Sequence, residues 1–308
     1  KLDLNGRNLS VQGDWAVGGV KTTSTVAGSS VPFYGAGTSH ILRAAGGPAL
    51  FNSLVAAKAS GATLMLLSDI ETFGTFTAST GAYLVGAHTQ RLHGGFFVGS
   101  GAVDVSVSTL IFTGSQPQSL GSAVGAAGGS VTSIGALFIQ TPAAISLVQS
   151  DIQVFVATQP NAMVLFESGS ITDIASMTVS GLAASSRVQL RGSVAGVAAQ
   201  LTLGLAPTLA FVYARDIDSS LGVAVTASNS VDGGGNTNWT FIGGGGGALK
   251  TWSYGGGSSA ASASANWAPA GAPAAGDSVV FGNTTPTSPC TWDLAVTVAT
   301  MSITGGYA

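Results

Sequence analysis

The side chains best able to do chemistry in this sequence are its few carboxylates. Only two glutamates occur, Glu71 and Glu167, and Asp69 stands two positions before the first of them. Enzymes that cleave glycosidic bonds need two carboxylates about 5–9.5 Å apart across a groove. Asp69 and Glu71 occupy alternate positions of an expected strand, so they share one face. We predict that they form a polar surface pair and that the chain is not an enzyme.

A second group of reactive side chains is formed by His88, Arg91 and His93 in the run AHTQRLHGG. Two histidines at this spacing could bind a metal ion from one face of a helix. The surrounding residues instead favour a strand, a turn and a second strand. No cysteine or carboxylate is adjacent to complete a metal site. We predict a polar turn here and no metal site.

Oxygen ligands of the kind that calcium prefers are concentrated between positions 216 and 238. Their spacing matches neither an EF-hand loop nor a nonapeptide calcium repeat. Asp and Asn side chains also bond to their own backbone in turns. We predict that these side chains form turns, and calcium binding is the alternative. We predict no cofactor elsewhere in the chain. The residues are Asp216, Asp218, Asn229, Asp232, Asn236 and Asn238.

β-Strands are the elements that must position these side chains. Val103, Val105 and Val107 alternate with polar residues, which predicts a strand with one buried face. The helix formers Glu and Lys number only two and four. Gly, Ser, Asn and Pro separate the strand-like runs. These runs cover residues 2–11, 62–70, 73–78, 103–113, 135–140, 145–158, 162–179, 188–194 and 201–213.

Loose internal repetition suggests how the strands are arranged. Residues 172–181 and 297–306 share a pattern of Thr, Met, a hydroxyl residue, a β-branched residue and Gly. Short strands with small turn residues and imperfect repeats are typical of a parallel β-helix, in which each coil stacks on the next. The fold class predicted is all-β, a right-handed parallel β-solenoid with a small C-terminal β module. Tandem β-sandwiches are the alternative.

The composition limits the classes of partner. Only 7% of the residues are charged, although 45% are hydrophobic and the net charge is −3. A folded chain with so few charges has little electrostatic protection against association with itself. The ten Lys and Arg residues form no basic stripe, which argues against nucleic acid as a partner. No run of about 18 apolar residues predicts a membrane span.

A change of composition after Phe241 predicts a domain boundary. Residues 243–247 are five glycines, and residues 255–265 contain only Gly, Ser and Ala. Four of the five tryptophans follow position 238. We predict a β-solenoid in residues 1–242. Residues 243–308 form a Gly/Ser-rich connection and a Trp-containing β module that continues or caps the solenoid.

The C-terminal tail carries the most specific pattern. It contains Asn266-Trp267, Pro273 and Gly276-Asp277, then Val279, Val280 and Phe281, and later Cys290, Asp293 and Gly305-Gly306-Tyr307. This pattern resembles modules of repetitive secreted bacterial and phage β-solenoid proteins, related to autotransporter-associated β-strand repeats. Residues 213–241 resemble the segment that closes a solenoid section in such proteins, and residues 2–15 resemble an opening coil. The resemblance implies an extracellular scaffold or adhesion role and no particular activity.

The two ends of the sequence resemble halves of an interrupted solenoid. Uncapped coils expose unpaired backbone groups and apolar side chains, which allow strand addition. We predict a head-to-tail contact between copies of the chain that gives a filament, because such a contact does not close on itself. The alternative is that the chain is part of a longer polypeptide. The predicted subunit interface comprises Leu2, Leu4, Leu9, Val11, Met301, Ile303 and Tyr307.

Together these features predict an extracellular structural protein that self-assembles into a filament, sheath or surface layer. Its main partner is then another copy of itself. One alternative is an adhesin or phage fibre that binds surface glycans, which would place it on a virion in the phage case. Another is a polysaccharide-degrading β-helix enzyme.

Overall fold

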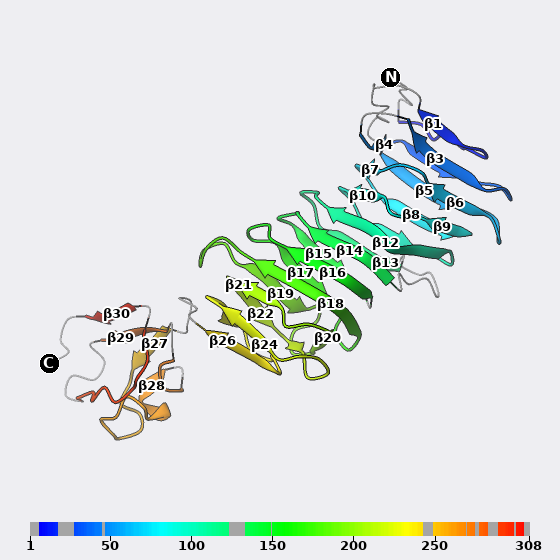
Figure 1. Cartoon of the computed structure of the whole chain (residues 1–308). Helices are drawn as coiled ribbons and strands as arrows, with labels where there is room; N and C mark the ends of the chain where they lie inside the picture. Colours follow the sequence, from blue (N-terminus) through cyan, green and yellow to red (C-terminus); the bar gives the residue numbers. More distant parts are fainter. Residues whose placement is uncertain are drawn as a thin grey trace.

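The computed structural model describes residues 6–17, 28–44, 47–122, 133–148, 150–242, 249–268, 270–274, 277–282, 289–298 and 300–304. Within them the chain is almost entirely strand, with a single 3₁₀ turn, η1 (Ser264–Asn266). Strands before residue 243 belong to two large sheets that run the length of the solenoid (Figure 1). All pairs between the named strands of these two sheets are parallel.

The prediction of a parallel β-solenoid is therefore confirmed, and the tandem β-sandwich alternative is wrong, since sandwiches pair their strands antiparallel. One sheet has 10 strands, and successive turns of the chain add one strand each. Its members are β2 (Ser30–Phe33), β5 (Ser53–Ala57), β8 (Phe76–Thr80), β11 (Phe96–Val98), β13 (Gln118–Ser122), β15 (Ala144–Leu147), β17 (Met163–Phe166), β19 (Val188–Gly192), β22 (Val212–Arg215) and β25 (Val231–Asp232).

The other large sheet has 16 strands, 11 of them in one continuous path. The path comprises β1 (Trp15–Val17), β3 (Ser39–Arg43), β6 (Thr63–Leu66), β9 (Ala82–Leu84), β12 (Ala102–Phe112), β14 (Ser133–Ile139), β16 (Asp151–Ala157), β18 (Ile171–Ser180), β21 (Thr208–Ala210), β24 (Val225–Ser228) and β26 (Trp239–Ile242). Beside it lie β4 (Ala49–Phe51), β7 (Ile70–Thr72), β10 (Thr89–Leu92), β20 (Ala199–Leu203) and β23 (Ile217–Asp218).

The cross-section of the solenoid changes at β12. Its first residues pair with β9, and its last residues pair with β10. Two strands that are separate in the earlier turns are thus replaced by one long strand. The early turns therefore contain three short strands each, whereas β14 and β16 each span the same side in one piece.

Apolar side chains one turn apart stack on each other inside the solenoid. The register pairs Leu54 with Phe76, Phe76 with Phe96, and Phe96 with Leu120. All four are completely buried, and the rings of Phe76 and Phe96 lie 4.7 Å apart. These pairings also show that one turn takes 22 residues, the next 20 and the next 24. Variable corners therefore connect a regular core.

The predicted alternation fails within β12. Val105 is fully buried, but Val107 is 68% exposed and Ser108 is 1% exposed, so the prediction of a buried Val107 is wrong. The register with β14 is irregular between Val105 and Thr109, which reverses the side chains beyond that point. The Ser108 hydroxyl donates a hydrogen bond to the carbonyl of Val105 at 2.8 Å, which satisfies it in the interior.

The C-terminal strands form a separate 4-stranded sheet with its own core. In the residues that the structure describes, they pair only with each other, and β27 with β28 is antiparallel. Trp252, Trp267 and Phe281 fill the core, and the two indoles meet edge to face at 5.0 Å. The predicted boundary at residue 243 lies in a segment outside the described residues. The sheet comprises β27 (Leu249–Trp252), β28 (Trp267–Ala268), β29 (Ser278–Phe281) and β30 (Thr300–Ile303).

Glycine is required where corners of successive turns touch. A Cβ at Gly94 would lie 2.3 Å from the carbonyl oxygen of Gly74, and one at Gly114 would lie 2.1 Å from that of His93. These contacts are to backbone, which cannot rotate away as a side chain does. A side chain at either position would therefore force the turns apart.

We expect Gly94→Ala to lower the free energy of unfolding by about 1–3 kcal/mol or more, because it overpacks a backbone contact. Gly37→Ala is the control, since a Cβ there meets nothing within 4 Å. Urea unfolding followed by circular dichroism measures both. Equal stabilities of the two variants would contradict the close stacking of the corners.

Candidate functional site

The N-terminal edge of the solenoid contains two of the predicted interface residues. Leu9 and Val11 donate backbone hydrogen bonds to the carbonyls of Ser30 and Pro32, at 3.1 and 2.9 Å. Their segment thus extends the 10-stranded sheet beyond β2, and the Val11 side chain packs on the solenoid core. Leu2 and Leu4 lie outside the described residues. Among the described residues, this segment pairs on one side only, with β2, and so forms the edge of the sheet.

At the other end of the solenoid, β26 pairs only with β24 in the described part of the chain. Trp239 and Phe241 stack at 5.7 Å and are partly buried against the solenoid core. The Trp239 indole donates to the Ser219 hydroxyl at 3.0 Å. Ile242, the last residue of β26, is 48% exposed. This end therefore presents apolar side chains beside a strand edge.

The edge of the C-terminal sheet is β30, which contains the predicted interface residues Met301 and Ile303. The register pairs Met301 with Val279 and Ile303 with Phe281. Val279 and Phe281 are 0% and 5% exposed, whereas Met301 and Ile303 are 52% and 64% exposed. The apolar face of the sheet thus continues to an edge strand that the described residues leave uncovered. Tyr307 lies outside them.

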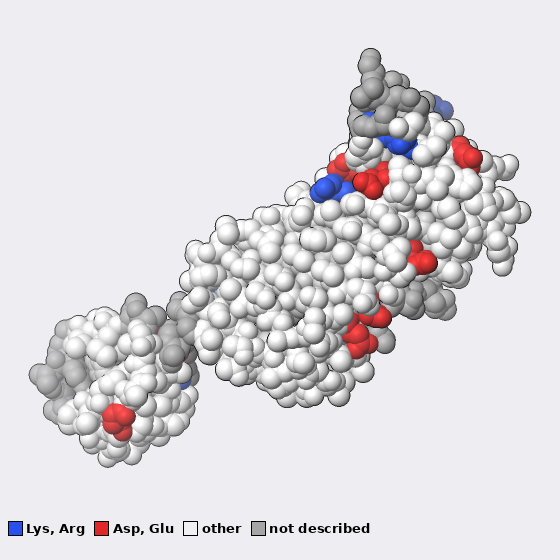
Figure 2. Space-filling model, in the orientation of Figure 1, with Lys and Arg blue, Asp and Glu red and all other residues white. Residues whose placement is uncertain are grey.

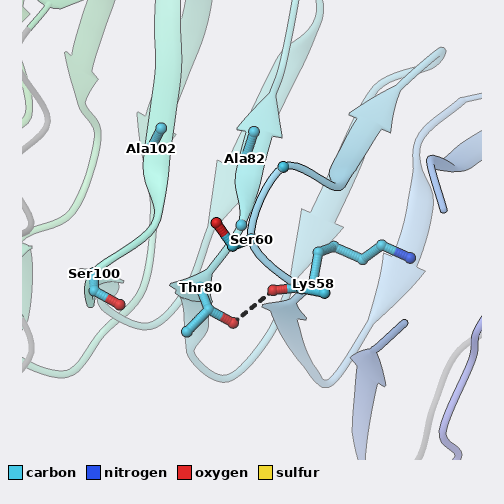
Figure 3. A pocket seen from close by; sticks show the side chains of 9 residues that line it. Lys58, Ser60, Thr80, Ala82, Ser100 and Ala102 are labelled. Carbon is cyan, nitrogen blue, oxygen red and sulfur yellow. Dashed lines mark hydrogen bonds between the residues drawn. The ribbon is translucent and has the colours of Figure 1, made fainter. Parts of the chain in front are cut away.

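Sequence reasoning missed a groove along one corner of the early turns. It has a volume of about 600 Å³ and crosses three successive turns. Each turn contributes a hydroxyl residue, Ser60, Thr80 or Ser100, followed by Gly-Ala, at a constant spacing of 20 residues (Figure 3). This repeat of hydroxyl, Gly and Ala was the signal in the sequence that could have revealed the groove. With hydroxyl, methyl and backbone groups on its walls, the groove is suited to binding rather than to proton transfer.

A buried lysine supports the same corner. Lys58 is fully buried, and its side chain runs away from Thr80 and Ser100 (Figure 3). Its Nζ donates to the Tyr34 carbonyl at 2.6 Å and to the Ser39 hydroxyl at 2.9 Å. Burial lowers the pKa of Lys58 from its usual value of 10.5, and Asp14 opposes this effect. The lysine therefore joins the first turns from inside.

The predicted surface pair Asp69 and Glu71 faces histidines of the next turn. The Asp69 carboxylate lies 3.7 Å from His88, and Glu71 lies 2.7 Å from Nε2 of His93. Arg91 is the register partner of Glu71 and lies inside β10, so the prediction of a turn at Arg91 is wrong. The 20-residue stacking of turns brings together groups that looked independent in the sequence.

The Asp and Asn residues of the 216–238 region bond mainly to backbone. Asp216 accepts from the Gly196 amide and lies 3.2 Å from Nε of Arg215. Asp232 accepts from the Gly234 amide at 2.8 Å, and Asn236 accepts from that of Ile217 at 3.1 Å. Asp232 thus caps its own turn, as predicted, whereas Asp216 and Asn236 bond to the backbone of the preceding turn of the solenoid. No cluster of three or more His, Cys, Asp or Glu suited to a metal occurs within the described residues.

Two further carboxylates lie side by side in the 16-stranded sheet. The register pairs Asp151 of β16 with Asp173 of β18. Neighbouring strands are about 4.8 Å apart, so the two like charges are close. This pair does not line the groove at Lys58.

Comparison with protein-family models, curated proteins and solved structures finds no match. Function must therefore be inferred from the geometry of the chain itself. No helix among the described residues is long and apolar enough to cross a membrane.

The buried Lys58 gives a pH test of the N-terminal turns. Between its lowered pKa in the folded state and 10.5, the unfolded chain binds more protons, so stability rises with pH. We expect Lys58→Met to remove a positive slope of at most about 1.4 kcal/mol per pH unit. Urea titrations between neutral pH and pH 10 measure the slope.

Thr80→Val is the matched control, because it removes the hydrogen bond to the Lys58 carbonyl and no titrating group. It should keep the slope of the unsubstituted protein. An unchanged slope in Lys58→Met would show that the amine is solvated.

Proposed function

We propose that this chain is a structural segment of an extracellular assembly, extended by strand pairing at the edges of its parallel sheets. The observation that carries the proposal is the edge strand β30. Its backbone is paired with β29 on one side, and Met301 and Ile303 extend a buried apolar face into the open. An edge of this kind is a template for another strand.

The segment at Leu9 and Val11 supplies a complementary edge. Among the described residues it pairs with β2 alone, next to a partly buried valine, and it lies at the opposite end of the described chain from β30. The two edges differ, so contact between them is head to tail and does not close. Repetition of that contact builds a filament, sheath or layer.

The surface supports association as well. The face in Figure 2 is largely free of charged side chains, in agreement with a charged fraction of 7%. Like charges that would repel a second copy are therefore few. The low charge and the Gly- and Ser-rich composition, together with the resemblance of the tail to secreted solenoid modules, support an extracellular location, on a cell surface or on a phage virion.

The same edges would serve if the chain continued covalently into further coils. The intact mass of the protein isolated from its source distinguishes the two cases. A mass close to 30.2 kDa supports separate subunits, and a much larger mass contradicts them.

A polysaccharide-degrading enzyme is the second candidate, and the pair Asp151 and Asp173 is the observation that favours it. A retaining glycosidase holds its two carboxyl groups about 5–5.5 Å apart, a spacing that residues on neighbouring strands can supply. The structural proposal is preferred because it rests on a described sheet edge, whereas the pair does not line the groove at Lys58. Loss of polysaccharide cleavage in Asp173→Asn would establish the enzyme.

We expect Met301→Lys combined with Ile303→Lys to abolish end-to-end assembly, because two cations on the edge strand oppose strand addition. Electron microscopy and sedimentation velocity compare the variant with the unsubstituted chain, which should form polymers with a constant axial repeat.

Leu182→Lys is the control, since Leu182 is 73% exposed at a corner away from both edges. It should polymerise normally. Monodisperse particles of the unsubstituted chain, or equal loss in the control, would refute edge pairing.

A further inference from the structure

Three arginines lie on or beside two adjacent strands of the 10-stranded sheet. Of the ten Lys and Arg residues, three lie between positions 187 and 215. Arg187 directly precedes β19, Arg191 lies within it, and Arg215 is the register partner of Arg191 in β22. Arg215 has an acidic partner in Asp216, at 3.2 Å. In the described part of the chain, Arg187 and Arg191 form no ion pair.

These two arginines line a hollow of about 280 Å³ on the 10-stranded sheet. The other walls are neutral and polar or aromatic, with an amide from each of Asn161 and Gln189 and the ring of Tyr213. The complete lining is Asn161, Ala184, Ser185, Arg187, Gln189, Arg191 and Tyr213.

Several polar atoms around the hollow are buried and have no hydrogen-bond partner among the described residues. They are Nε and Nη2 of Arg187, Nε of Arg191 and Oε1 of Gln189. Within the described part of the chain, Arg187 donates from Nη1 alone, to the Ala184 carbonyl. Burial lowers the pKa of Arg187, which indicates that its charge is poorly solvated. Buried donors on a cation are costly unless something accepts from them, so the set is suited to an oxyanion.

The aromatic wall is held in place by packing. The Arg191 guanidinium lies 4.9 Å from the centre of the Tyr213 ring, in a cation–π contact. A Cβ at Gly233 would come within 2.4 Å of the Tyr213 hydroxyl, so the ring rests on a position that only glycine leaves free. Tyr213 is also the register partner of Gln189. Ring, amide and guanidinium are therefore fixed by adjacent strands.

We propose that this hollow binds the carboxylate of an acidic sugar unit in a polysaccharide. The planar fork of an arginine matches a carboxylate with two parallel hydrogen bonds. The amides of Asn161 and Gln189 and the hydroxyl of Ser185 suit the sugar hydroxyls. A polyphosphate such as nucleic acid would need a longer row of cations than two free arginines. The proposal is independent of assembly through the sheet edges.

Binding requires a side-chain movement, because the unpartnered atoms of Arg187 are covered. We expect a rotation of Arg187 to break its hydrogen bond to the carbonyl of the exposed Ala184 and to make Nε and Nη2 accessible to a ligand. Arg191 and Tyr213 stay in place in their strands.

Isothermal titration of the full chain with tetragalacturonate tests the proposal. The neutral tetramer with reduced carboxyl groups should not bind. Arg187→Gln and Arg191→Gln should each raise the Kd roughly tenfold or more, since each removes a charged hydrogen-bond donor. Arg187→Lys keeps the charge without the fork and should weaken binding less than Arg187→Gln.

Arg91→Gln is the matched control, because it makes the same change of charge on the other large sheet and should leave the Kd unchanged. Thermal unfolding checks that each variant folds. Equal binding of the neutral tetramer, binding of a sulfated but not a carboxylated sugar, an equal effect of Arg91→Gln, or no binding at all would each overturn the proposal.

Discussion

Parallel backbone pairing between successive turns is the constraint on which the rest of this structure depends. It places each residue about 4.8 Å from its counterpart in the next turn, so every side chain has a partner above and below. Inside, this gives the stack of Leu54, Phe76, Phe96 and Leu120. At the corners it excludes any Cβ at Gly94. On the outside, it aligns the hydroxyl of Ser60 with the hydroxyls of Thr80 and Ser100 on the next two turns. Core, corner and surface are thus consequences of one geometry.

The same constraint explains why the edge strands are better suited to association than the faces of the sheets are. A turn within the solenoid satisfies its backbone on both sides, whereas an edge strand such as β30 does so on one side only among the described residues. Charged side chains commonly protect edges of this kind. Here Met301 and Ile303 occupy the edge instead, and their register partners Val279 and Phe281 are buried. An edge strand with apolar side chains in place of protective charged ones favours the addition of another strand. That strand can come from a second copy of the chain or from more of the same polypeptide.

The strand content and the solenoid could be predicted from the sequence because both depend on local pattern and on small corner residues. The register could not, because turn length varies irregularly, with 22, 20, 24 and 27 residues in four successive turns. Without the register, Glu71 and His93 looked unrelated, although they lie 2.7 Å apart. The irregularity in β12 could not be predicted either, since it depends on the pairing of that strand with β14, whose register shifts between Val105 and Thr109. Sites formed by residues from two different turns therefore cannot be predicted until the turn lengths are known.

This dependence on register also separates the two functional proposals. Edge pairing needs only backbone groups and apolar side chains, which low-charge composition and alternation already favour. The hollow at Arg187 needs three turns in the correct register, because Gln189 and Arg191 lie in β19, Tyr213 in β22, and Gly233 just beyond β25. A slip of one residue would reverse the faces of all these side chains. A solenoid is well suited to maintain such a site, since each strand is fixed by neighbours on both sides. The stacked turns can thus be lengthened by pairing at their edges. At the Arg187 hollow, the same stacking also holds a specific arrangement of side chains.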